Sequence, residues 1–144
     1  MEIKNRSAYF EYFIDEKYTA GIVLTGTEVK SLREGKANFN DSYCILIDGE
    51  LWLRSFHISP YSHGTVNNHD PIRERKLLLN RRELKKMANK LKEKGHTIIP
   101  LRLFFNEKNL VKVEIGLGKG KKLHDKRESI KQRDTDREIK RYIK

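Results

Sequence analysis

Three histidines are the residues whose type most directly suggests metal chemistry, because imidazole nitrogens are common metal ligands. His57, His63 and His69 follow one another at six-residue intervals, and Cys44 is the only thiol in the chain. Zinc sites pair their cysteine and histidine ligands at characteristic short spacings, and this spacing matches none of them. We therefore interpret the histidines as surface-loop residues and predict neither a metal nor a cofactor, with metal binding as the alternative.

A glycine-rich segment near the end of the chain is a candidate for phosphate binding. Gly116, Gly118 and Gly120 alternate with other residues and precede Lys121 and Lys122. The segment lacks the GxxxxGK[ST] spacing of a phosphate-binding loop, and no patterned helix follows it, so we predict a flexible hinge instead. No nucleophile–base pair and no paired carboxylates follow from the spacing elsewhere. The sequence therefore predicts a protein that is not an enzyme.

The charge of the chain indicates a polyanionic partner. The sequence holds 31 Lys and Arg against 20 Asp and Glu, a formal net charge of +11. Such an excess attracts nucleic acids whatever their sequence. Residues 81–94 alone hold seven Lys and Arg against two Glu. This segment could follow an RNA backbone, or it could be an ordinary solvated helix face.

Two further features could contact nucleic acid. Four aromatic side chains lie close together near the N-terminus: Tyr9, Phe10, Tyr12 and Phe13. They could stack on unpaired bases, although aromatic residues in a strand also pack into cores. Glu28 could accept hydrogen bonds from a base amino group or a ribose hydroxyl. Its spacing from Thr25 also fits a capping box, in which the glutamate stabilises the start of a helix.

These side chains need a scaffold, and the hydrophobic pattern predicts mainly short strands. We expect strands at 9–14, 19–24, 43–47, 51–56, 96–105 and 110–117. Asp48-Gly49 is typical of a two-residue hairpin turn. One helix is expected between Thr25 and Gly35, and a second between Asn80 and Gly95. The pattern favours a mainly β fold, a small closed OB-fold-type barrel with two or three flanking helices, and a sandwich is the alternative.

The end of the chain differs from the rest. Residues 118–144 hold 11 basic and five acidic side chains but only five hydrophobic ones, too few to form a core. We therefore predict a body at 1–117 and a flexible basic tail at 118–144, disordered when free. The single cysteine suits a reducing compartment, and no signal-peptide pattern or membrane-spanning run is present in this sequence. We expect a cytoplasmic protein with no membrane partner.

Several motifs resemble those of a known family. Along the chain they are Asn5-Arg6, the segment 20–33 (AGIVLTGTEVKSLR), Asp41-Ser42-Tyr43, His69-Asp70-Pro71, Arg75-Lys76-Leu77-Leu78-Leu79, Gly118-Lys119-Gly120-Lys121-Lys122 and His124-Asp125-Lys126-Arg127. Together they extend from Asn5 to about Asp134, nearly the whole chain. The chain resembles the SsrA-binding protein (SmpB) family, the bacterial partners of transfer-messenger RNA in ribosome rescue.

The resemblance implies an OB-fold-type barrel that binds RNA without catalysis. Such proteins hold the elbow of the tRNA-like domain of transfer-messenger RNA and deliver it to the empty decoding site of a stalled ribosome, with the tail in the messenger channel. Elongation factor Tu is implied as part of the delivered complex. The residues implied in RNA binding are Asn5, Arg6, Glu28, Lys30, Lys112, Lys119, Lys121 and Lys122. Those implied at the decoding site are His124, Asp125, Lys126 and Arg127.

Two other classes of protein could use the same barrel. One is a general single-strand-binding protein or RNA chaperone, and the other is a nuclease or RNA-modifying enzyme. Within the tail, Asp125 could cap a helix with Glu128 at its third position. Because the apolar stripe of this segment is thin, we predict that it becomes helical only against ribosomal RNA.

Overall fold

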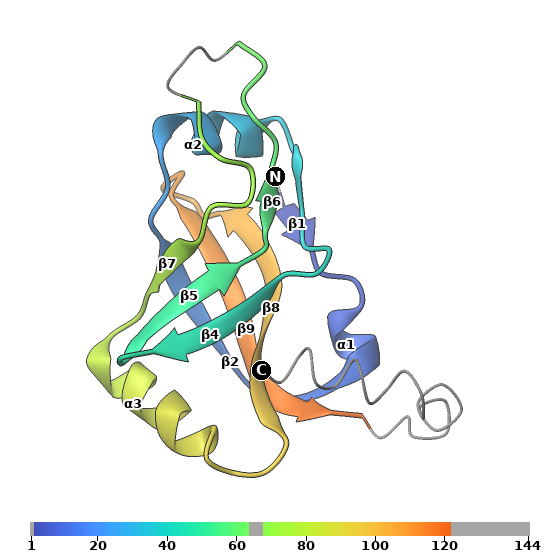
Figure 1. Cartoon of the computed structure of the whole chain (residues 1–144), viewed down its shortest axis with the longest axis vertical. Helices are drawn as coiled ribbons and strands as arrows, with labels where there is room; N and C mark the ends of the chain where they lie inside the picture. The colour runs from blue at the N-terminus through green and yellow to red at the C-terminus, as the bar shows by residue number, and fades with distance from the viewer. Residues whose placement is uncertain (1, 64–67, 122–144) are drawn as a thin grey trace.

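The computed structural model describes residues 2–63 and 68–121, which form an antiparallel sheet with three helices (Figure 1). The strands are β1 (Glu2–Lys4), β2 (Tyr12–Ile22), β3 (Ala37–Asn38), β4 (Tyr43–Ile47), β5 (Glu50–Arg54), β6 (His57–Ile58), β7 (Arg75–Leu78), β8 (His96–Phe105) and β9 (Val111–Gly120). The helices are α1 (Ala8–Glu11), α2 (Gly26–Arg33) and α3 (Arg81–Lys90). Among them, no helix is long and apolar enough to cross a membrane. The predicted mainly β fold is confirmed.

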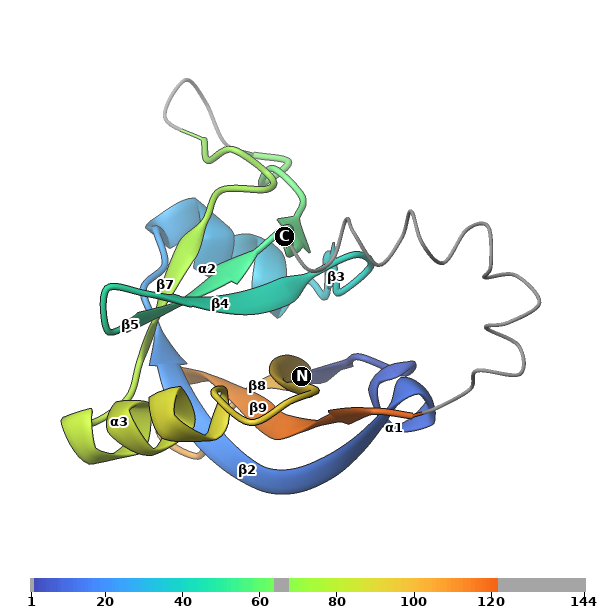
Figure 2. The ribbon, with the colours of Figure 1, turned by 60° about the horizontal axis from the view of Figure 1, so that its bottom comes forward.

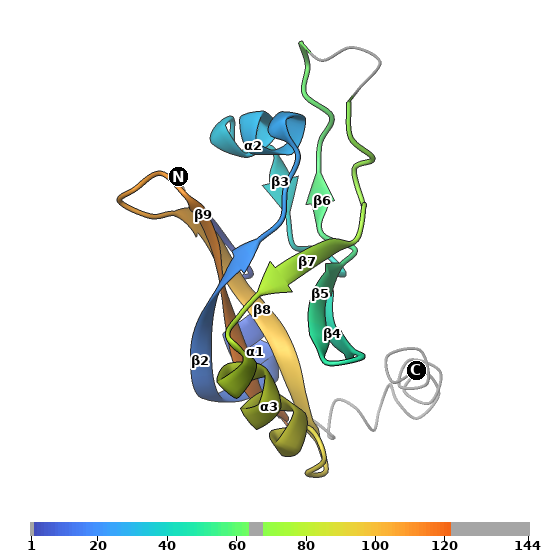
Figure 3. The same ribbon diagram turned by 90° about the vertical axis from the view of Figure 1, so that its left-hand side faces the viewer.

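The main sheet is curved into two layers, which are joined where β7 pairs with the end of the long strand β2. The seven strands of this sheet are hydrogen-bonded in the order β1-β8-β9-β2-β7-β5-β4, and β3 pairs separately with β6. β2 pairs with β9 along most of its length but with β7 only at Gly21 and Ile22. Figures 2 and 3 show the result: β2, β8 and β9 lie in one layer, β4 and β5 lie in the other, and β7 links them.

The predicted closure of the barrel is not seen in the described residues, where hydrogen bonds leave the sheet open between β1 and β4. β4 comes close to β8 without pairing with it. The N-terminal segment, for which the sequence predicted no strand, occupies part of the edge of β8. Residues 2–4 pair with residues 102–104, and the Asn5 amide donates to the Leu101 carbonyl at 2.8 Å. That part of the edge is therefore closed to β4.

The hydrophobic core fills the space between the two layers. Leu51, Leu53, Leu77, Leu103 and Ile115 are almost completely buried there. Burying one such side chain stabilises the fold by about 1.5–3 kcal/mol. Helices α2 and α3 close this core from outside, with one buried apolar side chain each, Leu32 from α2 and Met87 from α3.

The first two predicted strands are wrong in their bounds. Residues 8–11 form α1, and β2 then runs without interruption through the polar residues 15–17. A strand carries these residues because its side chains alternate between faces: Asp15 and Lys17 are exposed, while half-buried Glu16 accepts a hydrogen bond from the Tyr18 hydroxyl at 2.6 Å. A register shift between Ile14 and Glu16 marks a bulge.

The turns and caps agree better with the sequence. Asp48 and Gly49 connect β4 and β5 with φ of 51° and 78°, the left-handed conformations of a type I′ turn. Asn80 and Glu83 form the predicted capping box of α3. That helix ends at Lys90, before Gly95, which adopts a φ of 83° in the turn into β8.

The glycines near the end of the body belong to β9, so the predicted hinge is wrong. Gly116 pairs with Ile99 and Lys17, and Gly118 pairs with Thr97 and Ile14. A Cβ atom on Gly118 would lie 2.0 Å from the Phe13 carbonyl oxygen. The lack of a side chain at Gly118 therefore allows β2 and β9 to approach closely. The strand β9 continues beyond Leu117 to Gly120.

The Gly118→Ala substitution is expected to lower the free energy of unfolding by about 3 kcal/mol, the upper end of overpacking costs, because backbone rather than a flexible side chain must move. Urea unfolding monitored by circular dichroism measures it. Gly120→Ala is the matched control, since the nearest atom to its Cβ is Tyr12 Cε1 at 4.0 Å. Equal stabilities of the two variants would contradict the close approach of the strands.

Candidate nucleic-acid interface

The start of α2 is held by a buried carboxylate. Thr25 caps the helix, and its hydroxyl accepts from the Glu28 amide at 3.3 Å. In return, Glu28 Oε1 accepts from the Thr25 amide at 2.8 Å. The predicted capping box is therefore present. The Glu28 side chain is completely buried, although capping boxes form at helix ends that usually face solvent.

Two arginines surround the Glu28 carboxylate. Arg73 Nη2 donates to Oε1 at 2.7 Å and Arg73 Nε donates to Oε2 at 3.1 Å. Arg75 Nε donates to Oε2 at 2.7 Å. Arg75 is itself fully buried in β7, and it also donates to the Phe56 carbonyl at 2.6 Å. We call Glu28, Arg73 and Arg75 the buried ion-pair cluster.

The cluster controls the ionisation of its members. Burial by itself would raise the pKa of the Glu28 carboxyl, but hydrogen bonds from Arg73, the Thr25 amide and Arg75 hold the pKa below its ordinary value. Burial lowers the pKa of Arg75, while the hydrogen bond to Glu28 raises the pKa of Arg73. Glu28 is thus ionised at neutral pH and balances part of the charge of the two guanidinium groups.

Both carboxylate oxygens of Glu28 are engaged within the protein. Direct contact between this carboxylate and RNA would require the cluster to open, so the RNA contact predicted for Glu28 stays a prediction. Arg73 is the member of the cluster that reaches the surface, since about a third of its side chain is exposed (34%). The sequence did not single out Arg73, and it indicated Arg75 only as part of a family motif, not as a partner of Glu28.

The buried histidine of the predicted loop fixes α2 to the segment before β7. His69 Nε2 lies 2.9 Å from the Ile58 carbonyl oxygen, which can only accept, so Nε2 carries the proton. Nδ1 then accepts from the Thr27 hydroxyl at 2.9 Å. His57 is half-buried and His63 is exposed. In residues 2–63 and 68–121, no cluster of His, Cys, Asp and Glu side chains could hold a metal ion.

Two predicted lysines lie near the α2 end of the body. Lys30 is exposed on α2, and its Nζ lies 5.5 Å from the centre of the Tyr61 ring. Lys112 is half-buried on β9, where it pairs with Gly21 and Phe104. Both are positioned by rigid elements, which suits contacts that must match the shape of an RNA.

Two other predicted lysines lie at the opposite end of β9. Lys119 pairs with Phe13 and is exposed. It is separated from Lys112 by seven residues, about 23 Å along an extended strand. Lys121 Nζ donates to the Tyr9 carbonyl at 2.9 Å and lies 5.1 Å from the centre of the Phe13 ring. The predicted lysines therefore form two groups rather than one site.

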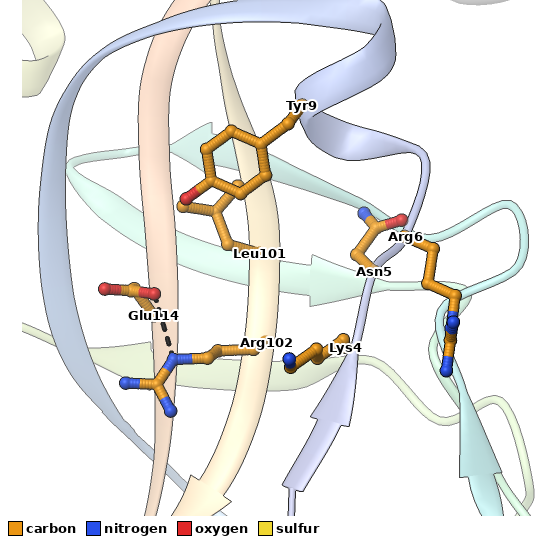
Figure 4. Close-up of a pocket in the computed structure, with 7 residues that line it drawn as sticks. All are labelled: Lys4, Asn5, Arg6, Tyr9, Leu101, Arg102 and Glu114. Carbon is orange, nitrogen blue, oxygen red and sulfur yellow. Dashed lines mark hydrogen bonds and ion pairs between the residues drawn. The ribbon is translucent and has the colours of Figure 1, made fainter.

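A shallow depression of about 350 Å³ lies beside α1 on the outer face of the sheet. Figure 4 shows the ion pair between Arg102 and Glu114 beside Lys4 in this depression, with Asn5 and Arg6 on the segment before α1. Arg102 Nε donates to Glu114 at 3.0 Å, and its Nη1 donates to Glu2 at 2.8 Å.

Asn5 and Arg6 differ in what they can offer a ligand. The Asn5 side-chain amide donates to the Pro100 carbonyl at 2.7 Å, which anchors this segment to β8. Arg6 is exposed. Asn5 thus has a structural contact, and Arg6 is the more accessible of the two. Lys122, His124, Asp125, Lys126 and Arg127, together with the predicted tail helix, lie outside the described residues.

Three of the four N-terminal aromatic side chains are exposed. The exposed fractions are 49% for Tyr9, 67% for Phe10 and 60% for Phe13. Tyr12 is half-buried against the small apolar cluster between α1 and the sheet. The exposure of these rings favours the base-stacking interpretation over the core interpretation for all but Tyr12.

A curved antiparallel sheet with basic and aromatic side chains on its surface defines a class of protein, the small mainly β nucleic-acid-binding proteins. The model of the SmpB protein family matches residues 2–144, and the chain belongs to this family.

Named relatives and a solved structure agree with this assignment. The SsrA-binding protein of Fervidobacterium nodosum is 55% identical over 140 residues, which cover 97% of this chain and 94% of the relative. The SsrA-binding protein of Phocaeicola vulgatus is 54% identical over 144 residues, covering 100% and 96%. A chain from the structure described as "tmRNA-SmpB: a journey to the center of the bacterial ribosome" is 48% identical, with a TM-score of 0.70 and 85% of each chain covered.

Proposed function

We propose that this protein binds the tRNA-like domain of transfer-messenger RNA and delivers it to stalled ribosomes for trans-translation. The observation that carries this function is the match over almost the whole chain to SsrA-binding proteins, at 54% and 55% identity. The similarity to a chain from a tmRNA-SmpB structure supports the ribosome as the second partner. Elongation factor Tu is part of the proposed delivered complex.

The surface of the body suits recognition of folded RNA. The grooves of an RNA helix expose few readable base edges, so proteins recognise folded RNA by its shape, its phosphates and its unstacked loop bases. Lys30 and Lys112 at one end of the body are proposed phosphate contacts, as are Lys119 and Lys121 near the other end and Arg6 on the segment before α1. Asn5 is proposed to position its neighbours. Glu28 is proposed to act indirectly, by orienting the exposed side of Arg73.

The tail adds the proposed ribosomal contacts. Lys122 and the motif His124 to Arg127 are proposed to bind RNA, with the motif at the decoding site. We propose an RNA-binding body with an OB-type scaffold, followed by a basic tail. Because β9 runs to Gly120, the body extends past the predicted boundary at 117/118. We further propose that the protein works without catalysis and, because its partner is the ribosome, in the cytoplasm.

Preference for folded RNA tests this function. The full chain is expected to bind an isolated tRNA-like domain at least about tenfold more tightly than an unstructured RNA of equal length at physiological salt, a difference of about 1.4 kcal/mol. Fluorescence anisotropy with both RNAs measures it. Equal affinities would instead favour a general single-strand-binding protein, and cleavage of either RNA in the presence of a divalent metal would favour a nuclease.

The same measurement on a shortened chain locates the preference. Because β9 continues to Gly120 and the Lys121 amide donates to the Glu11 carbonyl at 2.9 Å, the chain should be shortened after Lys121 rather than after Leu117. We expect the shortened chain to keep the preference and to lose affinity for both RNAs, because the tail contributes sequence-independent attraction.

A further inference from the structure

Helix α3 exposes an unusually basic surface. Its apolar side chains face the core, where Met87 is buried and Leu84 packs beside it. The opposite side carries Arg81, Arg82, Lys85 and Lys86, all exposed, and we call these four residues the α3 basic face. The family motifs identified in the sequence do not include this helix.

The α3 basic face has no acidic partner in the described part of the chain. Glu83 lies in the same turn, but its carboxylate accepts from the Asn80 amide at 3.2 Å. Glu93, just beyond the helix, pairs with Lys90 at 3.5 Å. None of the ion pairs formed among residues 2–63 and 68–121 includes a member of the face. As far as residues 2–63 and 68–121 are concerned, its four charges are therefore available to a ligand.

This arrangement of charges opposes the stability of the helix. Arg81 and Lys85, and likewise Arg82 and Lys86, are like charges four residues apart, which repel on a helix surface. Arg81 and Arg82 also lie in the first turn, where the helix dipole favours acidic side chains. If the face served only to keep the protein soluble, a mixture of acidic and basic side chains would do so and would also stabilise the helix. A polyanionic ligand, by contrast, would be attracted to all four positive charges and would offset the repulsion between them.

The position of the face suggests which RNA it meets. α3 and α2 lie at opposite ends of the body (Figures 1 and 3), so the α3 basic face lies far from Lys30 on α2. It lies at the same end as Lys119, which pairs with His96 just after α3. We propose that the α3 basic face binds the phosphate backbone of ribosomal RNA, independently of the RNA sequence. This inference rests on the proposed function, in which the protein contacts the delivered RNA and the ribosome at the same time.

A charge-removal variant of the full chain tests the inference. R82Q/K85Q/K86Q removes three charges and keeps side chains of similar helix propensity. In K36Q/K76Q/K108Q, the matched control, three charges are removed outside α3. Binding to vacant ribosomes and to the isolated tRNA-like domain is measured over a range of KCl concentrations. Thermal melts are expected to show that R82Q/K85Q/K86Q is at least as stable as the parent.

We expect the α3 variant to lose at least about tenfold in affinity for ribosomes at about 0.1 M KCl. The slope of log K against log salt should be reduced by about two to three, roughly one unit for each phosphate that the variant no longer neutralises. Its affinity for the tRNA-like domain should change by less than about threefold. Unchanged ribosome binding, an equal loss with the control variant, or an equal loss on the tRNA-like domain would each overturn the inference. Failure of the parent chain to prefer the tRNA-like domain would instead overturn the proposed function.

Discussion

Replacing Glu28 with glutamine is expected to lower the free energy of unfolding by about 3–5 kcal/mol, the cost of breaking a buried ion pair. Glutamine can still accept from the Thr25 amide, so the helix cap survives in part. It cannot balance the charge of Arg75, which is completely buried and lies 2.7 Å from the carboxylate. The variant therefore leaves an uncompensated guanidinium in the core. Urea unfolding of the full chain measures the loss.

Glu83→Gln is the matched control for this prediction. Glu83 occupies the same position in the capping box of α3 and accepts from the Asn80 amide, but it lies at the surface and has no arginine partner among the ion pairs of the described residues. We expect its substitution to cost at most about 1 kcal/mol, as for the loss of a cap. If both glutamine variants lost the same stability, the cluster would contribute nothing beyond capping.

The pH dependence of stability follows from the same cluster. The pKa of Glu28 in the folded protein lies below its ordinary value of 4.5, so the folded state binds the proton less readily than the unfolded chain. Its contribution to stability is complete above the ordinary value and is lost as the pH falls through the lowered pKa. Stability measured from about pH 6 downward should therefore fall less steeply in Glu28→Gln than in the parent.

Local features of the fold could be predicted from the sequence because a few adjacent residues determine them. The capping boxes at Thr25 and Asn80 depend on spacings of three residues, and the hairpin at Asp48-Gly49 depends on two residues that adopt positive φ. The long strand β8 was predicted with its observed bounds, since its hydrophobic run is nearly continuous. Each of these elements is set by interactions between near neighbours.

The missed features depend on contacts between distant residues. Arg73 and Arg75 lie 45 and 47 residues from Glu28, and nothing within either segment indicates that they meet. The glycines of β9 look like a hinge until β2 is placed beside them, where Gly118 allows the close approach of Phe13. One sequence feature could have suggested the cluster. Arg73-Glu74-Arg75 places charged residues directly before an apolar run that forms a buried strand.

The RNA-contacting residues stay predictions, and the structure adds how they are arranged. The family resemblance implied Lys112 by its position, while Lys30 and Lys119 were chosen mainly for their charge; the structure places all three on helices or strands. The motifs could not indicate that Lys112 and Lys119 lie at opposite ends of β9, because that separation depends on the length of the strand. Because β9 separates these two lysines, the protein can contact RNA at both ends of the body.

Alanine at Asp125, Lys126 and Arg127 together is expected to abolish peptide tagging while leaving binding to transfer-messenger RNA within about twofold of the parent. The body does not depend on these residues, because β9 ends at Gly120 and Lys121 is fixed by the carbonyls of Glu11 and Tyr9. The substitutions remove two of the basic side chains proposed to meet ribosomal phosphates, and they remove the predicted cap of the tail helix.

A paired gel shift and in vitro tagging reaction measures the two effects separately. The matched control, R133A/D134A/R137A, removes two basic side chains and one acidic side chain from the same tail, outside the His124–Arg127 motif. Because it makes the same change in net charge, it should retain most of the tagging activity if the motif acts through specific contacts at the decoding site. Loss of tagging in both variants would show that the motif acts only through its charge. Normal tagging by the motif variant would show that these residues are not needed for tagging.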